Sequence, residues 1–233
     1  MSTENFLKQK KKIVIIDFGS QVTKLIARRI RELKVYCEIV NLKNFKKIKN
    51  FYNIKGIILS GGPSTVTQKI YPSISRSIFK KNIPILGICY GLQLIAKVFG
   101  GKIKKSQKKR EFGEAILLEK SKSPLFKNFF NNKKTTVWMS HQDAVFKIPK
   151  GFENLASTNN SKYTAIQNKK KNIYGIQFHP EVTHTKNGFK VIKNFVLNIC
   201  KIKKNWMIGI EKNRIISDLK DKIKSDRVIC ALS

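Results

Sequence analysis

The feature that most constrains the fold of this chain is the regular alternation of short apolar runs with stretches of helical periodicity in its N-terminal half. The apolar runs, each expected to form a buried strand, are 11–20, 35–40, 56–64 and 83–88. The stretches with helical spacing are 21–33, 74–80 and 91–101. Because strands that alternate with helices form parallel βαβ units, the sequence predicts an α/β fold. We expect an open, mostly parallel sheet with helices on both faces.

Residues 112–178 follow a different pattern, with shorter strand-like stretches separated by polar turns. This pattern predicts an antiparallel or mixed extension of the sheet. A further helix is expected over 189–200, and a polar linker follows it at 201–206. Beyond the linker we expect a helix up to about Lys224 and then a strand that opens at 227–233.

A cysteine stands on the expected turn between the fourth strand and the helix that follows it. Cys89 lies between Gly87 and Gly91, which is the spacing of a nucleophile elbow with cysteine in place of serine. The start of the helix would stabilise a thiolate, and the amides of Tyr90 and Gly62 would face a developing oxyanion. The alternative is a structural role, since free cysteine is among the most buried residue types.

A cysteine nucleophile needs a base, and the chain offers three histidines, His141, His179 and His184. Glu181 follows His179 at an offset of two residues and would orient its imidazole. Asp143 follows His141 at the same offset, whereas His184 has no acidic residue on its C-terminal side. The pattern by itself leaves both His-x-carboxylate pairs open.

The chain is strongly basic, with 48 Lys and Arg against 14 Asp and Glu and a net charge of +34. Such a charge is the usual electrostatic signature of nucleic-acid binding. The basic residues, however, are spread along the whole chain in short groups, and no zinc-finger, helix-turn-helix or RNP pattern accompanies them. We therefore do not expect nucleic acid to be the main partner.

Cysteine usage and hydropathy exclude other classes of site. The four cysteines form no C-x-x-C pair, so we expect no metal site and no disulfide. No apolar stretch approaches the roughly 18 residues of a membrane span, and no signal-peptide pattern is present. The sequence predicts a cytoplasmic protein that is not associated with a membrane.

Motifs along the chain carry a family resemblance. They are IDFGSQ (16–21), SGGPS (60–64), GICYGLQ (87–93), REFG (110–113), WMSHQD (138–143) and HPEVTHT (179–185). Together they resemble the class I glutamine amidotransferases over about residues 13–200. IDFGSQ, REFG and HPEVTHT are the most specific, and they resemble the members whose amidotransferase domain is joined to an ATP pyrophosphatase domain. The resemblance implies a flavodoxin-like amidotransferase domain at 12–202.

The resemblance also implies a role for each matching residue. Cys89 would be the nucleophile, His179 the general base and acid, and Glu181 the carboxylate that orients it. Gly62 and Tyr90 would form the oxyanion hole. The glutamine pocket would be held by Gln93, Ser140, His141 and Asp143.

The implied function is to release ammonia from glutamine through a cysteine thioester. In these relatives a second domain uses the ammonia for the ATP-dependent amination of XMP to GMP, in purine biosynthesis. The resemblance implies that 203–233 are a linker and the first strand of that domain, which acts in cis or in trans and allows a homodimer through the C-terminal part. No cofactor is expected in this chain, because ATP and Mg²⁺ belong to the synthetase half. The alternative function is a catalytically silent, basic remnant that acts as a binding module.

Overall fold

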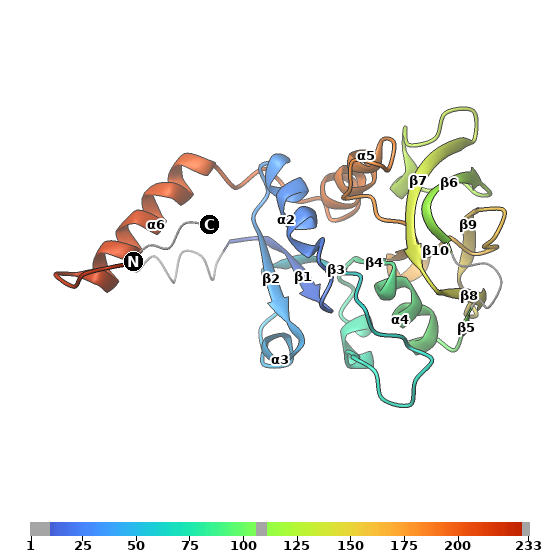
Figure 1. Ribbon diagram of the computed structural model, residues 1–233, viewed down its shortest axis with the longest axis horizontal. Helices are drawn as coiled ribbons and strands as arrows, with labels where there is room; N and C mark the ends of the chain where they lie inside the picture. Colours follow the sequence, from blue (N-terminus) through green and yellow to red (C-terminus); the bar gives the residue numbers. More distant parts are fainter. Residues whose placement is uncertain (1–9, 106–110, 230–233) are drawn as a thin grey trace.

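The computed structural model describes residues 10–105 and 111–229 of the chain (Figure 1). Within these residues, strands form one large sheet in the order β2-β1-β3-β4-β11-β10-β9-β6-β7 and a small sheet of β5 and β8. The strands of the parallel part are β1 (Lys12–Asp17), β2 (Cys37–Asn41), β3 (Ile54–Leu59), β4 (Ile85–Ile88) and β11 (Ile173–Ile176). The others are β5 (Lys102–Lys105), β6 (Glu111–Glu119), β7 (Lys134–His141), β8 (Asp143–Lys147), β9 (Glu153–Ser157) and β10 (Ala165–Asn168).

All the strands predicted from the N-terminal half of the sequence are present, and all are parallel. β1 pairs with β2 and β3, and β3 pairs with β4, in a common direction. The sequence grouped residues 173–178 with the extension, but β11 lies parallel to β4, with Gly175 opposite Gly87. Because β11 is also antiparallel to β10, it is the strand at which the sheet changes from parallel to antiparallel pairing. β9, β6 and β7 continue the antiparallel part, which confirms the expected extension.

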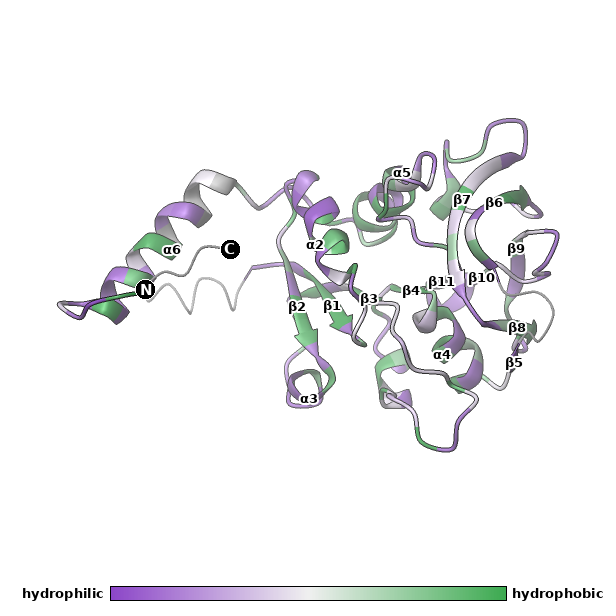
Figure 2. Cartoon of the chain, viewed as in Figure 1, coloured by the Kyte–Doolittle hydropathy of each residue, from purple (hydrophilic) through white to green (hydrophobic). Residues whose placement is uncertain are grey.

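Both faces of the parallel part are covered. Successive side chains of a strand point to opposite faces, and Ile13 and Ile15 pack in one apolar cluster while Val14 and Ile16 pack in the other. Figure 2 shows hydrophobic residues along β1 and β2. The first cluster includes residues of α2 (Thr23–Glu32) and α5 (Gly188–Lys193). The second includes residues of α3 (Leu42–Phe45) and α4 (Tyr90–Val98).

Two expected helices take a different form. The stretch at 74–80 is a 3₁₀ turn, η1 (Arg76–Lys80), whose start is capped by the Ser75 hydroxyl. The helix expected at 189–200 is α-helical only at α5 and continues as a π-helical segment, η4 (Asn194–Ile199). Two short 3₁₀ turns, η2 (Pro124–Phe126) and η3 (Lys169–Lys171), lie in the loops.

The C-terminal segment leaves the body of the protein beside α2. The linker is held there by Asn205, whose backbone N–H donates to the Lys34 carbonyl at 2.8 Å and whose side chain donates to the Lys11 carbonyl. α6 (Ile208–Ile223) then projects away from the sheet (Figure 1). Residues 227–229 form no strand, and the rest of the strand expected at 227–233 lies outside the described residues. The domain boundary after 202 stays a prediction. No helix in the described ranges is long and apolar enough to cross a membrane.

Candidate active site

Cys89 occupies the sharp turn between β4 and α4. Its backbone has φ 52° and ψ −103°, a left-handed conformation that is strained for a residue with a Cβ. A Cβ on Gly87 would collide with the carbonyl of Gly91, and a Cβ on Gly91 would collide with that of Leu59. The glycines therefore let α4 start directly against two neighbouring strands. The Cys89 N–H donates to the Ile176 carbonyl at 2.8 Å, which fixes the turn against β11.

His179 lies just beyond the end of β11, the strand that pairs with β4. Its ring Nδ1 is 2.8 Å from Oε1 of Glu181, and this carboxylate is 1% exposed. Cys89 lies on the same side of the hollow: a Cβ on Gly61 would be 3.3 Å from Cε1 of His179 and 3.6 Å from Cβ of Cys89. Burial lowers the pKa of His179, but the hydrogen bonds to Cys89 and Glu181 outweigh burial and raise it to about 10. The arrangement favours the charged, imidazolium form of His179.

The two amides expected to form an oxyanion hole lie at the same edge of the sheet. Tyr90 is the first residue of α4, where backbone N–H groups have no partner within the helix. The Ser60 hydroxyl donates to the Gly61 carbonyl at 2.7 Å. Since a trans peptide places N–H opposite C=O, this bond turns the Gly62 N–H away from Ser60. Both residues line the same hollow as Cys89 and His179.

That hollow has a volume of about 690 Å³ and brings together the predicted substrate-side residues. Gln93 is almost fully buried, and its amide donates to the backbone carbonyl of Asp143 at 2.8 Å. The Asp143 carboxylate accepts from the Thr65 hydroxyl. Ser140 places its carbonyl 3.7 Å from the Cys89 sulfur. All four predicted positions, Gln93, Ser140, His141 and Asp143, line this one hollow.

The partner of His141 differs from the one that the sequence suggested. His141 faces Glu111, opposite it on β6, with Nε2 3.2 Å from Oε2, whereas Asp143 turns to Thr65. Nε2 of His141 and Oε2 of Glu111 approach each other without the alignment of a hydrogen bond. Glu111 is held in turn by the Thr158 hydroxyl at 2.7 Å. This pair results from the register between the antiparallel strands β6 and β7. Local spacing in the sequence does not specify that register.

Sequence reasoning missed one buried residue beside the nucleophile. Gln177 is fully buried and donates from Nε2 to the Cys89 sulfur at 3.5 Å. The available signal was its position two residues before His179, because residues two apart on an extended segment point to the same side.

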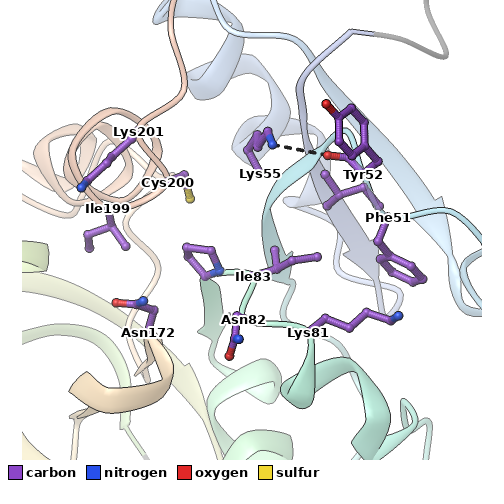
Figure 3. Close-up of a pocket in the computed structure, with 12 residues that line it drawn as sticks. Phe51, Tyr52, Lys55, Lys81, Asn82, Ile83, Asn172, Ile199, Cys200 and Lys201 are labelled. Carbon is purple, nitrogen blue, oxygen red and sulfur yellow. Dashed lines mark hydrogen bonds between the residues drawn. The ribbon is translucent and has the colours of Figure 1, made fainter.

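A second hollow of about 620 Å³ opens at the amino ends of β3, β4 and β11 (Figure 3). Three of its twelve lining residues are lysines, in a chain with 48 Lys and Arg among 233 residues. Lys55 donates to the Tyr52 carbonyl at 3.3 Å, and burial raises the pKa of the Cys200 thiol well above its ordinary value. This hollow therefore offers neither a reactive thiol nor a concentration of charge. Among the described residues, no group of three or more His, Cys, Asp or Glu side chains is placed to hold a metal ion.

Comparisons with known proteins identify the family of this chain. Residues 14–199 match the family model described as glutamine amidotransferase class-I. The chain is 47% identical over 226 residues to a glutamine-hydrolyzing GMP synthase of Brachyspira hyodysenteriae, with 95% of this chain and 43% of the relative covered. For the GMP synthase of Thermosipho melanesiensis the identity is also 47%, with 96% and 43% covered. The chain thus spans less than half the length of these relatives.

Solved structures show the same fold. The structure of a putative GMP synthase component from Thermoplasma acidophilum aligns with a TM-score of 0.70 at 30% identity, over 90% of this chain and 98% of that one. A glutamine amidotransferase of Thermotoga maritima aligns with a TM-score of 0.64 at 20% identity, over 92% and 98%. At 20% identity, the second similarity is evidence for the fold alone.

Proposed function

This chain belongs to the class I glutamine amidotransferases, and we propose that it is the glutaminase unit of a GMP synthase, with Cys89 as its nucleophile. The observation that carries the proposal is that Cys89, on its strained turn, lines the same hollow as His179, which pairs with buried Glu181. A thiolate is the nucleophilic form of cysteine, and an adjacent imidazolium stabilises it.

The first half of the reaction forms a thioester. The Cys89 sulfur attacks the side-chain carbonyl carbon of glutamine, and the N–H groups of Tyr90 and Gly62 stabilise the resulting oxyanion. The tetrahedral intermediate collapses by breaking its C–N bond. His179 gives its proton to the leaving nitrogen, so that ammonia departs and His179 is left neutral.

The second half regenerates the site. Neutral His179 takes a proton from water, and the oxygen of that water attacks the thioester carbon. The C–S bond of the second tetrahedral intermediate breaks and returns the Cys89 thiolate beside the His179 imidazolium. The product carboxyl group ionises, its proton goes to solvent, and glutamate leaves. Glu181 holds the ring through Nδ1 and stabilises the imidazolium.

The remaining lining residues suit the amino-acid end of glutamine. The Asp143 carboxylate would attract the α-amino group, and His141 would face the α-carboxylate. Both side chains are at least nine-tenths buried, so polar contacts with them would be only weakly screened by solvent. Gln93 and Ser140 shape the wall between this end of the pocket and the sulfur.

The ammonia would be used by a synthetase partner. We propose that residues 203–233 are a linker and the start of an ATP pyrophosphatase domain that aminates XMP to GMP in the cytoplasm. ATP and Mg²⁺ would bind to that domain rather than to residues 12–202. The names and lengths of the GMP synthase relatives support this assignment, because each continues well beyond the region matched here.

The test is the release of glutamate and ammonia from glutamine, with and without a complementing ATP pyrophosphatase domain, ATP and XMP. We expect turnover that disappears in Cys89→Ala and persists in Cys200→Ala, which removes a buried thiol at the opposite edge of the sheet. Turnover that survives in Cys89→Ala would refute the role of Cys89. A folded wild-type chain without turnover in either condition would favour the silent binding module instead.

A further inference from the structure

A line of buried side-chain amides connects the glutamine pocket with the nucleophile. Nε2 of Gln93 lies 2.8 Å from the Asp143 carbonyl and 3.4 Å from Oε1 of Gln177. Nε2 of Gln177 lies 3.5 Å from the Cys89 sulfur. Gln177 is fully buried, and Gln93 is 4% exposed. The residues come from the turn before α4, from α4 itself, from β8 and from the segment after β11, so the tertiary fold brings them together.

The contacts fix which end of each amide faces its neighbour. A backbone carbonyl only accepts hydrogen bonds, so Gln93 must turn its NH₂ group toward Asp143. The second hydrogen of that NH₂ group points to the oxygen of Gln177. The Gln177 NH₂ group is then left facing the sulfur. A donor at this position follows from the network itself and does not depend on how the amide of Gln177 is drawn.

We propose that Gln177 is a further catalytic residue of this site, whose amide donates to the Cys89 sulfur and holds it as a thiolate directed at the substrate. The donor favours the charged sulfur because hydrogen bonds to ionised acceptors are stronger than those to neutral ones. In the thiol form, by contrast, the sulfur donates weakly to the Ser140 carbonyl at 3.7 Å. The catalytic part of this inference rests on the proposed glutaminase function. The effect on the sulfur does not.

Alkylation of Cys89 by iodoacetamide measures the effect directly and needs neither glutamine nor a partner. The Cys89 peptide is quantified by mass spectrometry over a range of pH, in wild type and in Gln177→Met, which keeps the side-chain length and removes the donor. We expect alkylation at neutral pH to be about tenfold slower in Gln177→Met, with the midpoint of the pH profile about one unit higher. Gln177→Glu, which places a carboxylate at the sulfur, should slow alkylation further.

The matched control is Gln167→Met. Gln167 is also fully buried, on the neighbouring strand β10, but its amide contacts Ser123 and Glu153 outside the pocket. We expect this variant to lose stability and to keep the wild-type alkylation profile. Profiles of Gln177→Met and Gln177→Glu that match that of Gln167→Met would overturn the proposal. If Gln177→Met does not fold, Gln177→Glu alone decides it.

Glutamine turnover then separates the two proposals. A shifted alkylation profile together with a lower kcat and an unchanged KM supports both. A shifted profile in a chain whose wild type does not turn glutamine over supports the role of Gln177 at the sulfur and contradicts the proposed function. An alkylation profile that is unchanged in the Gln177 variants, together with normal glutamine turnover, supports the proposed function and contradicts the role of Gln177 at the sulfur.

Discussion

Nδ1 of His179 lies 2.8 Å from Oε1 of Glu181, and both groups are buried beyond the end of β11. The pair fixes the ring so that its other nitrogen is available to the substrate side of the site. A carboxylate in this position also stabilises the imidazolium that the reaction requires.

Glu181→Gln keeps an oxygen as acceptor and removes the charge. We expect kcat for glutamine hydrolysis to fall by about two orders of magnitude or more, with little change in KM, because the imidazolium loses its counter-charge. Steady-state kinetics measure both. Glu119→Gln is the control, because Glu119 pairs with exposed Lys122 at the end of β6. Equal losses in the two variants would argue against a specific role for Glu181.

The raised pKa of His179 predicts how stability depends on pH. Burial opposes the charge, but the hydrogen bonds to Cys89 and Glu181 raise the pKa from 6.5 to about 10. The folded protein thus holds this proton more tightly than the unfolded chain. The resulting stabilisation is fully present below about pH 6.5 and is lost as the pH rises through about 10. Denaturant unfolding of wild type and His179→Gln should show a gap that narrows over this range. Parallel curves would contradict the prediction.

Removal of the Glu111 carboxylate should destabilise the back of the pocket. Glu111→Leu leaves the Thr158 hydroxyl and the His141 imidazole buried beside an apolar side chain, and we expect the free energy of unfolding to fall by about 2 kcal/mol. Glu111→Gln still accepts from Thr158 and should cost less. Chemical denaturation gives both values. A larger loss for Glu111→Gln than for Glu111→Leu would contradict a stabilising role for the hydrogen bond from Thr158.

The glycine after the nucleophile should tolerate no side chain. In Gly91→Ala the new Cβ would enter the space of the Leu59 carbonyl, so we expect a loss of about 3 kcal/mol in unfolding free energy and loss of activity. Gly209→Ala is the control, since a Cβ there has no neighbour within 4 Å. Thermal unfolding and turnover compare the two variants. Wild-type stability in Gly91→Ala would mean that α4 can move away from β3.

Helix type is one property that sequence spacing predicted poorly. Apolar periodicity in 74–80 and 189–200 indicated where the chain turns back on the sheet, but the first segment is 3₁₀ and the second is partly π. Both segments are short, and in short segments packing against the sheet outweighs intrinsic helical preference.

The sequence by itself determined the parallel strands of the N-terminal half and the turn at Cys89, and it offered His179 with Glu181 as one of two candidate pairs. These features depend on residues close together in the chain, where apolar runs, flanking glycines and a two-residue offset limit the backbone to few conformations. Only the tertiary structure decided that His141 pairs with Glu111 and that Gln177 reaches the sulfur of Cys89. The physical reason is strand order and register. β11 lies beside β4 although 84 residues separate Ile88 from Ile173 in the chain, and no local pattern specifies which strands become neighbours.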